Sequence, residues 1–162
     1  MEIRLVEPSD YDAVSDLIVT AYVGDGYIDP SSDYVRHLRD TATRAEQAEV
    51  WVAVEGEELV GVITNCPAGS PWKELSGDGE GEFRMLAAAP AARGRGVGEA
   101  LVRHCEDLAI TDGATRMWLT TIDDMTHARQ IYARLGYTHV AERDWYPDEM
   151  PDLVLRAWTK EL

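Results

Sequence analysis

Polar and apolar residues alternate in several short stretches of the chain, and this period of two is typical of β-strands. It occurs at residues 2–6, and again at 49–55 and 59–66, where the tight turn between the two stretches predicts a hairpin. The same pattern predicts further strands over residues 82–89, 116–121, 137–143 and 153–158.

Four segments instead carry apolar residues three and four positions apart, as the buried face of a helix does. They cover residues 11–22, a more polar stretch at 32–44, residues 97–108, and residues 126–135, which Gly136 is well suited to terminate. The segment between residues 67 and 81 is rich in Gly, Pro, Ser and acidic residues, which predicts a mobile surface loop.

The order of these elements is strand, two helices, three strands, helix, strand, helix and two strands. It favours an α+β fold, with a mixed sheet covered by helices on both faces, over a pure parallel alternation. The length of 162 residues suits a single domain that covers residues 1–162.

The chain has 30 acidic and 15 basic residues, which gives a formal net charge of −15. A field of that sign repels nucleic acid and anionic membranes, so neither is expected as a partner. The acidity has two interpretations, general solubility or an acidic mouth that attracts a cationic substrate. Cys66 and Cys105 are too few for a disulfide framework. No signal-peptide pattern or membrane-length apolar segment is found, so a cytoplasmic location is expected.

One stretch contrasts with this acidity, PAARGRGVGEALV at residues 90–102, where two arginines and three alternate glycines precede a helical pattern. Glycines at a strand-to-helix junction let backbone amides converge on an anion. A nucleotide-triphosphate loop is excluded because Gly98 is followed by Glu99 and Ala100. The third glycine comes one position too early for a dinucleotide fingerprint, and the stretch is too short for an RNA-binding tract. A plain glycine-rich turn and a diphosphate clamp remain.

The six residues from Arg93 to Gly98 resemble a signature of the GNAT superfamily of acetyl-CoA-dependent N-acetyltransferases, Gln/Arg-x-x-Gly-x-Gly/Ala. The strand MLAAAP before it and the segment ARQIYARLGY after it lie where that superfamily has its acetyl-CoA strand and its second signature. The resemblance covers nearly the whole chain. It implies a three-layer fold around a mixed, mostly antiparallel sheet of about six or seven strands, with about four helices on its two faces.

The resemblance implies that acetyl-CoA is the acyl donor. The backbone amides from Gly94 to Glu99 would hold its pyrophosphate, and Arg93 would add charge, whereas Arg95 is assigned either to the adenosine phosphates or to solvent. The preceding strand would pair with the pantetheine, although its three consecutive alanines also suit a tight helix contact. The expected cofactor-binding residues are Leu86, Ala87, Ala88, Arg93, Gly94, Arg95, Gly96, Val97, Gly98 and Glu99. Met125 stands where many members have an Asn, which leaves one cofactor contact open.

Two residues are expected to carry the proton transfers. Tyr132 matches the tyrosine of the second signature, and the resemblance implies that it protonates the departing CoA thiolate, as a phenol with a pKa of about 10 can. In isolation it also suits a core position. Glu82 lies near the place where several members keep a basic carboxylate, and is either the general base or a solvated strand end.

The loops at residues 24–34 and 144–152 occupy the places that line the acceptor groove in this superfamily. Tyr27 and Trp145 are the expected substrate residues, because aromatic faces suit an ammonium group. The expected reaction is acetyl transfer to a primary amine by direct attack in a ternary complex. The acceptor would be a small cationic amine, an amino acid or a peptide amine. No metal is expected, because no metal-spaced His and Cys cluster is found.

Two alternative functions stay open: a CoA-binding module without turnover, and an enzyme that transfers a different acyl group. The oligomeric state is open as well, and a homodimer could form through an exposed edge of the last strand.

Overall fold

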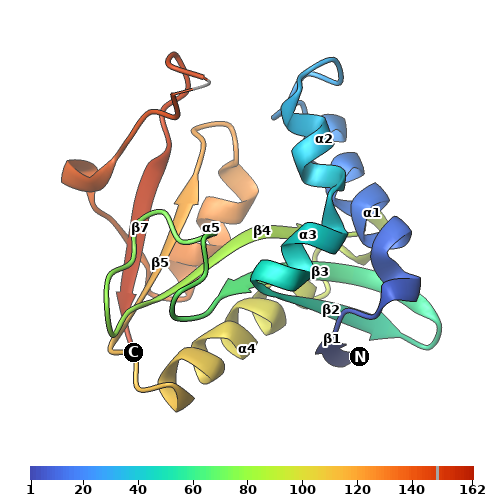
Figure 1. Ribbon diagram of the computed structural model, residues 1–162, viewed down its shortest axis with the longest axis horizontal. Coiled ribbons are helices and arrows are strands. Elements are labelled where there is room, and N and C mark those ends of the chain that lie inside the picture. Colours follow the sequence, from blue (N-terminus) through green and yellow to red (C-terminus); the bar gives the residue numbers. More distant parts are fainter. Residues whose placement is uncertain (149) are drawn as a thin grey trace.

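A computed structural model describes residues 1–148 and 150–162, and within them one sheet has the strand order β1-β2-β3-β4-β5-β7-β6 (Figure 1). The strands are β1 (Glu2–Leu5), β2 (Glu49–Glu55), β3 (Glu58–Cys66), β4 (Gly81–Ala88), β5 (Arg116–Thr121), β6 (Thr138–His139) and β7 (Arg156–Glu161). The helices are α1 (Tyr11–Gly24), α2 (Tyr34–Arg39), α3 (Thr41–Gln47), α4 (Val97–Thr111) and α5 (Thr126–Arg134). The chain therefore has the α+β architecture expected from its hydrophobic pattern.

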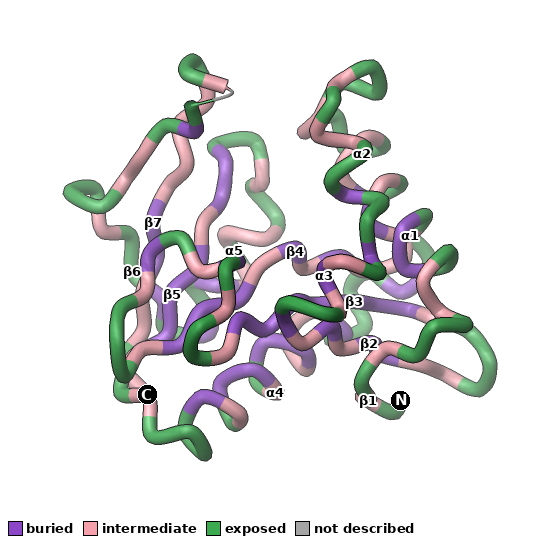
Figure 2. Tube along the Cα trace, viewed as in Figure 1, coloured by how far each residue is buried: buried purple, intermediate pink, exposed green. Residues whose placement is uncertain are grey.

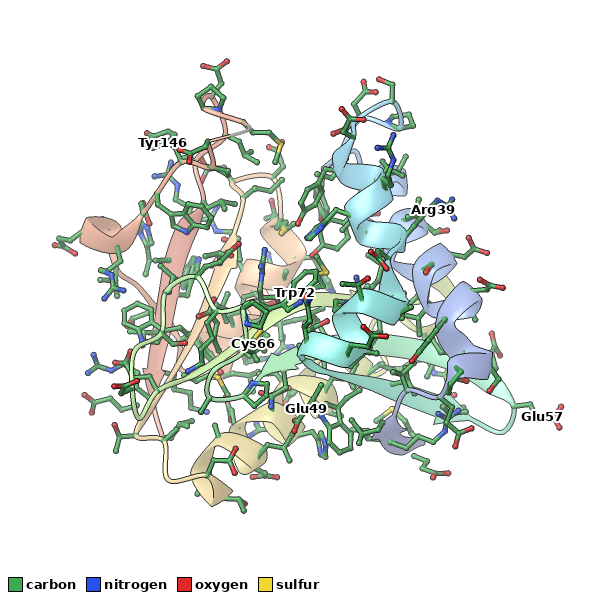
Figure 3. All side chains as sticks on the ribbon, in the orientation of Figure 1. Arg39, Glu49, Glu57, Cys66, Trp72 and Tyr146 are labelled. Carbon is green, nitrogen blue, oxygen red and sulfur yellow. The ribbon has the colours of Figure 1, made fainter. Side chains whose placement is uncertain are left out.

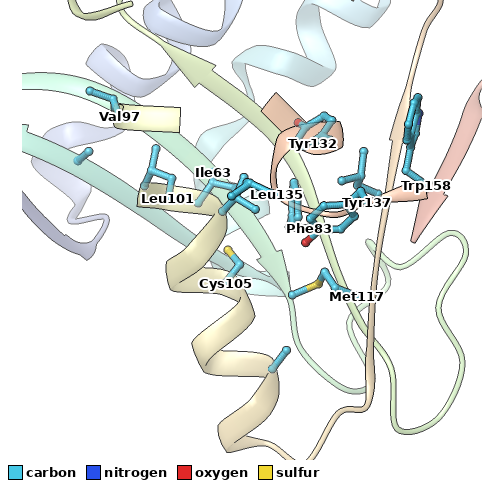
Figure 4. Close-up of a cluster of buried hydrophobic side chains, with 14 of the residues drawn as sticks. Ile63, Phe83, Val97, Leu101, Cys105, Met117, Tyr132, Leu135, Tyr137 and Trp158 are labelled. Carbon is cyan, nitrogen blue, oxygen red and sulfur yellow. The ribbon is translucent and has the colours of Figure 1, made fainter. Parts of the chain in front are cut away.

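Helices cover both faces of the sheet, and each face has its own apolar core. On one face α1 and α2 bury Val14, Ile18 and Leu38 against β2, β3 and β4. On the other face α4 and α5 pack on the sheet, with Leu101 and Cys105 at the centre of the cluster (Figures 2 and 4). The expectation of helices on both faces is confirmed.

The sheet is mixed because one strand pair is parallel. The pair β4–β5 runs parallel and every other neighbouring pair runs antiparallel. The ladder between β4 and β5 holds only at Gly81↔Met117 and Glu82↔Trp118, after which the strands diverge (Figure 1). Met85 has a positive φ of 53° beside a register shift in the β3–β4 pairing, which marks a bulge in β4. The sheet therefore opens along the carboxyl-terminal part of β4.

Three predicted elements, one helix and two strands, have wrong boundaries for local reasons. The predicted helix over 32–44 is two helices, because Asp40 ends α2 and its side chain accepts a hydrogen bond from the Thr43 amide at the start of α3. The last strand begins at Arg156, since Leu155 is held outside it by an isolated bridge to Trp145. The strand predicted over 137–143 shortens to two residues, and residues 141–143 form a short 3-10 turn.

The segment predicted as a mobile surface loop is packed at its centre. Trp72 and Leu75 are buried, and Trp72 Nε1 donates to Gln47 Oε1 over 3.0 Å. Burial of these two large apolar side chains stabilises the loop, although the glycines and acidic residues around them predicted a mobile segment.

The last strand was expected at an edge of the sheet, where it could pair across a dimer. It instead lies between β5 and β6, and β6 pairs with its residues Trp158 and Thr159. Both cysteines are buried free thiols, which agrees with the expected lack of a disulfide framework. Within residues 1–148 and 150–162, no helix combines the length and the apolar character needed to cross a membrane.

Candidate active site

A groove follows the opening between β4 and β5, and its two ends have different linings. One end, of about 870 Å³, lies along residues 86–88 and the start of α4, and we call it the glycine half. The other, of about 980 Å³, lies among Tyr34, His37, Trp72, Trp145 and Tyr146, and we call it the aromatic half. Both halves are lined by Tyr22, Arg84, Met85, Thr120 and Met125. The shared lining makes them one continuous groove.

Backbone amides dominate the glycine half. Gly94 and Gly96 have φ values of 74° and 84°, which side chains rarely adopt, so glycine is needed to turn β4 into α4. Gly96 caps α4 without a side-chain hydrogen bond. The amides of the first helical turn have no acceptor within a helix, so those of Val97, Gly98 and Glu99 face the groove at the positive end of the helix dipole. This arrangement suits an anion.

The two arginines of the stretch differ in position. Arg93 lines the groove, and its guanidinium forms two hydrogen bonds with Asp25, of 2.9 and 2.8 Å. Arg95 does not line either half, and it pairs instead with Glu55 at the β2–β3 turn. Arg93 is thus placed as expected, with an acidic partner that balances its charge, and the exposed position of Arg95 agrees with the solvent alternative.

The strand β4 presents one backbone edge to the glycine half. Ala87 and Ala88 pair with Val62 and Gly61 of β3, whereas beyond Glu82 no described strand pairs with the opposite edge. Leu86, Ala87 and Ala88 line the groove there, as the sequence predicted. Ala87 is also buried under α1, so the small side chains serve the helix contact and the groove together.

Tyr132 is buried in the wall of the glycine half. Its ring lies 5.9 Å from the rings of Phe83 and Tyr137 (Figure 4). Burial raises the pKa of the phenol above its ordinary value of 10.0, so the hydroxyl stays protonated at neutral pH. The position is therefore both a core position and one that faces the groove.

Glu82 lies outside both halves of the groove, contrary to expectation. Its carboxylate is 1% exposed and accepts hydrogen bonds of 2.8 to 3.0 Å from the amides of Glu74, Leu75 and Ser76 and from the Ser76 hydroxyl. It is neither a solvated strand end nor within reach of a bound amine. Glu82 instead fixes the loop that precedes β4.

The loop that Glu82 holds contributes a carboxylate that the sequence interpretation missed. Glu74 lines the aromatic half, and its Oε1 lies 2.7 Å from Nη2 of Arg84. Burial raises the pKa of Glu74, and the neighbouring Arg84 opposes that shift. Trp72 and Leu75, close to Glu74 in the sequence, were the available signal for a packed loop, since large apolar residues in an acidic loop indicate packing.

In the part of the chain that the structure describes, no three His, Cys, Asp or Glu side chains are grouped as a metal site requires.

Ring side chains from separate segments form the aromatic half (Figure 3). His37 stacks on Trp72 at 4.8 Å, and Tyr34 lies 5.2 Å from His37. Trp145 lies here, as expected, on the loop that also carries the exposed Tyr146. Tyr27 does not, because it lines the glycine half, edge-on to Tyr22 at 6.2 Å.

Comparison with solved structures shows the same fold over the whole chain. An acetyltransferase of the GNAT family from Staphylococcus aureus superposes with a TM-score of 0.78 at 16% identity, and the match covers 99% of this chain and 98% of that one. An acetyltransferase from Bacillus subtilis, solved in complex with CoA, gives a TM-score of 0.69 at 21% identity, covering 99% and 98% of the two chains. At these low sequence identities, the two superpositions show a shared fold only.

Comparison of sequences identifies relatives that are longer than this chain. Mycothiol acetyltransferase from Nocardia farcinica is 31% identical over 149 residues, which cover 89% of this chain and 44% of that protein. The protein of the same name from Beutenbergia cavernae is 32% identical over 77 residues, or 48% and 26% of the two. The chain thus spans less than half the length of these curated relatives. The model of the acetyltransferase (GNAT) family matches residues 11–137, most of the chain. The chain therefore belongs to the acetyltransferase (GNAT) family.

Proposed function

We propose that this protein transfers the acetyl group of acetyl-CoA to the nitrogen of a primary amine. The observation that carries the proposal is the continuous groove, which joins an anion site made of amides to an aromatic half lined by the ion pair of Glu74 and Arg84. Tyr132 lines that groove from its protonated, buried position.

The residues of the glycine half fit the donor. The amides of Val97, Gly98 and Glu99 would hold the pyrophosphate, and the φ of 84° at Gly96 keeps the space in front of them free of a side chain. The unpaired edge of β4 would accept an extended chain with amide groups, as an added strand does. Bound there, acetyl-CoA supplies the acetyl group as a thioester. The structure solved with CoA belongs to a protein of the same fold, which supports the assignment.

Tyr132 would act as the general acid. Its Oη would give a proton to the departing sulfur, a strongly basic group that a phenol with a raised pKa still protonates. Phe83 and Tyr137 hold the ring in place, so its hydroxyl needs little reorganisation during the reaction.

The aromatic half would bind the amine acceptor. Ring faces from Tyr34, Trp72 and Trp145 attract a cation, and the surplus of acidic residues raises its local concentration. Direct attack by the amine requires both substrates in the groove together, which the shared lining of the halves allows.

Thiol release from acetyl-CoA tests this proposal. The wild-type protein is assayed with amines, amino acids, polyamines, aminoglycosides and peptide N-termini, and propionyl-CoA and succinyl-CoA replace the donor in parallel. We expect at least one amine to release CoA from acetyl-CoA. Binding of acetyl-CoA with no release for any amine would identify a non-catalytic CoA-binding module, and release only from another donor would identify a different acyl group.

The Tyr132→Phe variant tests the acid separately. It keeps the ring packing against Phe83 and Tyr137 and removes only the proton, so kcat should fall about 100-fold with both KM values little changed. Unfolding temperatures of the two proteins provide the control. A kcat near that of the wild type would contradict the acid role.

A further inference from the structure

We infer that Glu74 binds the ammonium group of the acceptor and takes its proton, and that the acceptor carries this amine on a flat apolar body. The inference rests on the proposed acetyltransferase activity and names the acceptor chemistry and the base of that reaction.

Glu74 lines the aromatic half, where its side chain pairs with Arg84. Nη2 of Arg84, a residue that lines both halves, lies 2.7 Å from Glu74 Oε1, so the carboxylate is held beside a residue shared by the two halves. Among the described residues no second hydrogen bond or ion pair engages this carboxylate. The other oxygen, Oε2, is thus available to a bound ammonium group.

The position of Glu74 is fixed through its backbone. Its amide donates to Glu82 Oε1 over 2.9 Å, and the next two amides donate to the other oxygen of the same carboxylate. Although Glu74 is an exposed residue overall, its side chain keeps only 21% of its accessible surface, because it lies over Arg84. Glu82 is therefore a positioning residue: it holds the loop whose Glu74 carboxylate would contact the substrate.

Other carboxylates of the groove are less suited to this role. Asp33 has a side chain that is 97% exposed and pairs with Arg36, and Asp148 is exposed at the rim. Charges in full contact with water bind ammonium weakly because solvent screens them. Glu74 is the described carboxylate in this half with a largely covered side chain.

The rings around Glu74 indicate what carries the amine. Trp72 lies under the guanidinium of Arg84 at 5.6 Å and stacks on His37, while Trp145 and Tyr146 line the same half. Flat apolar groups pack well between such faces, and they gain burial that a polyamine or a sugar would not.

The proton movements balance with two protein groups. Glu74 Oε2 takes one proton from the ammonium, which frees the nitrogen lone pair to form the N–C bond as the C–S bond breaks. Tyr132 Oη gives its proton to the sulfur. The second proton lost by the nitrogen restores the Tyr132 phenol, and Glu74 releases its proton to solvent.

The pH dependence of kcat/KM for the acceptor should then report the protonation of the Glu74 carboxylate. The groups that face it are Arg84 and Glu82 on β4, Tyr34 and His37 on α2, and Cys66 on β3. Because burial raises the pKa of Glu74 above 4.5, the activity should fall as the pH drops through that raised value.

The test compares Glu74→Gln with Asp78→Asn, which removes an exposed acid from the same loop outside the groove. Calorimetry on the CoA-loaded protein measures binding of 2-phenylethylamine and of its neutral analogue 2-phenylethanol. We expect Glu74→Gln to weaken amine binding about tenfold and to leave alcohol binding unchanged, with Asp78→Asn like the wild type. In turnover with the best acceptor, Glu74→Gln should lower kcat/KM about 100-fold and lose the acidic limb of the pH profile.

The outcomes separate this inference from the proposed function. Amine binding that depends on Glu74 without any thiol release would overturn the acetyltransferase proposal and support the ammonium site. Turnover by Glu74→Gln at the wild-type rate, with the same acidic limb, would overturn the role of Glu74 and leave the activity standing. Binding of the amine no tighter than the alcohol by the wild type would overturn the inference as well.

Discussion

The glycine half and the aromatic half of the groove are built from different parts of the chain. The amide site and the strand edge of the glycine half come from one continuous segment, residues 86–99, although other side chains of its lining come from α1, β5 and α5. The aromatic half takes side chains from α1, α2, the loop before β4 and the loop after residue 144, which are far apart in the sequence (Figure 3). A site made of consecutive backbone groups leaves a sequence motif, whereas a site made of scattered side chains does not.

The same difference governs how each half can vary. Replacement of a side chain in the aromatic half changes the surface that an acceptor meets while the sheet and the amide site are kept. At the amide site of the glycine half, the restricted positions are those that set the backbone path, such as Gly94 and Gly96. One fold can thus keep a constant donor and change its acceptor through the loops.

The largest change in a KM is expected where a side chain would disturb the backbone of the glycine half. Gly96→Val places a branched residue at a φ of 84°, which costs about 1 to 3 kcal/mol and moves the amides that follow. The KM for acetyl-CoA should rise roughly tenfold, and the acceptor KM should change little. Steady-state kinetics with each substrate varied in turn provides the measurement.

Gly113→Val is the matched control for that variant. Gly113 has a φ of 80°, and like Gly96 it has open space where a Cβ would point, but it lies past the end of α4, away from the groove. The strain is alike, so both variants should lose similar unfolding free energy. Equal rises in the KM for acetyl-CoA in the two variants would show that general destabilisation, and not the amide site, is being measured.

A smaller effect, confined to the other substrate, is expected in the aromatic half. Tyr146 is 61% exposed and lines the groove, so Tyr146→Ala removes a ring face without opening the core. The acceptor KM should rise about fivefold, the equivalent of one aromatic contact, while the KM for acetyl-CoA stays unchanged. Ile110→Ala, which truncates an exposed apolar residue on α4, should alter neither value. A change in the KM for acetyl-CoA in Tyr146→Ala would show that the halves are not independent.

The order of the strands and helices was predictable because each element carries its own hydrophobic period. The role of the glycines was predictable for a similar reason, since the positive φ at Gly94 and Gly96 is a requirement of the local backbone. Tyr132 was identified by a local motif in the same way. Each of these features lies within a few consecutive residues.

The features that were missed depend on contacts between distant residues. The sequence places Glu74 in a loop and Glu82 at the start of a strand, but only the fold shows that Glu82 accepts hydrogen bonds from the loop amides and that Glu74 lines the groove. Tyr27 was assigned to the acceptor from its loop, although the end of α1 directs it toward Asp25 and the glycine half. The position of β7 inside the sheet likewise follows from pairing that no single segment encodes.

The smallest effect is expected from the arginine that looked most conspicuous in the sequence. Arg95 pairs with Glu55, has a side chain that is 53% exposed, and does not line the groove, so Arg95→Ala loses a surface ion pair worth about 0 to 1 kcal/mol. The KM for acetyl-CoA should change less than about twofold, because the anion site consists of amides. Arg93→Ala, which removes the guanidinium that does line the groove, should raise the same KM severalfold. A larger effect at Arg95 than at Arg93 would mean that side-chain charge, and not the backbone, holds the donor, and the contrast between the two halves would fail.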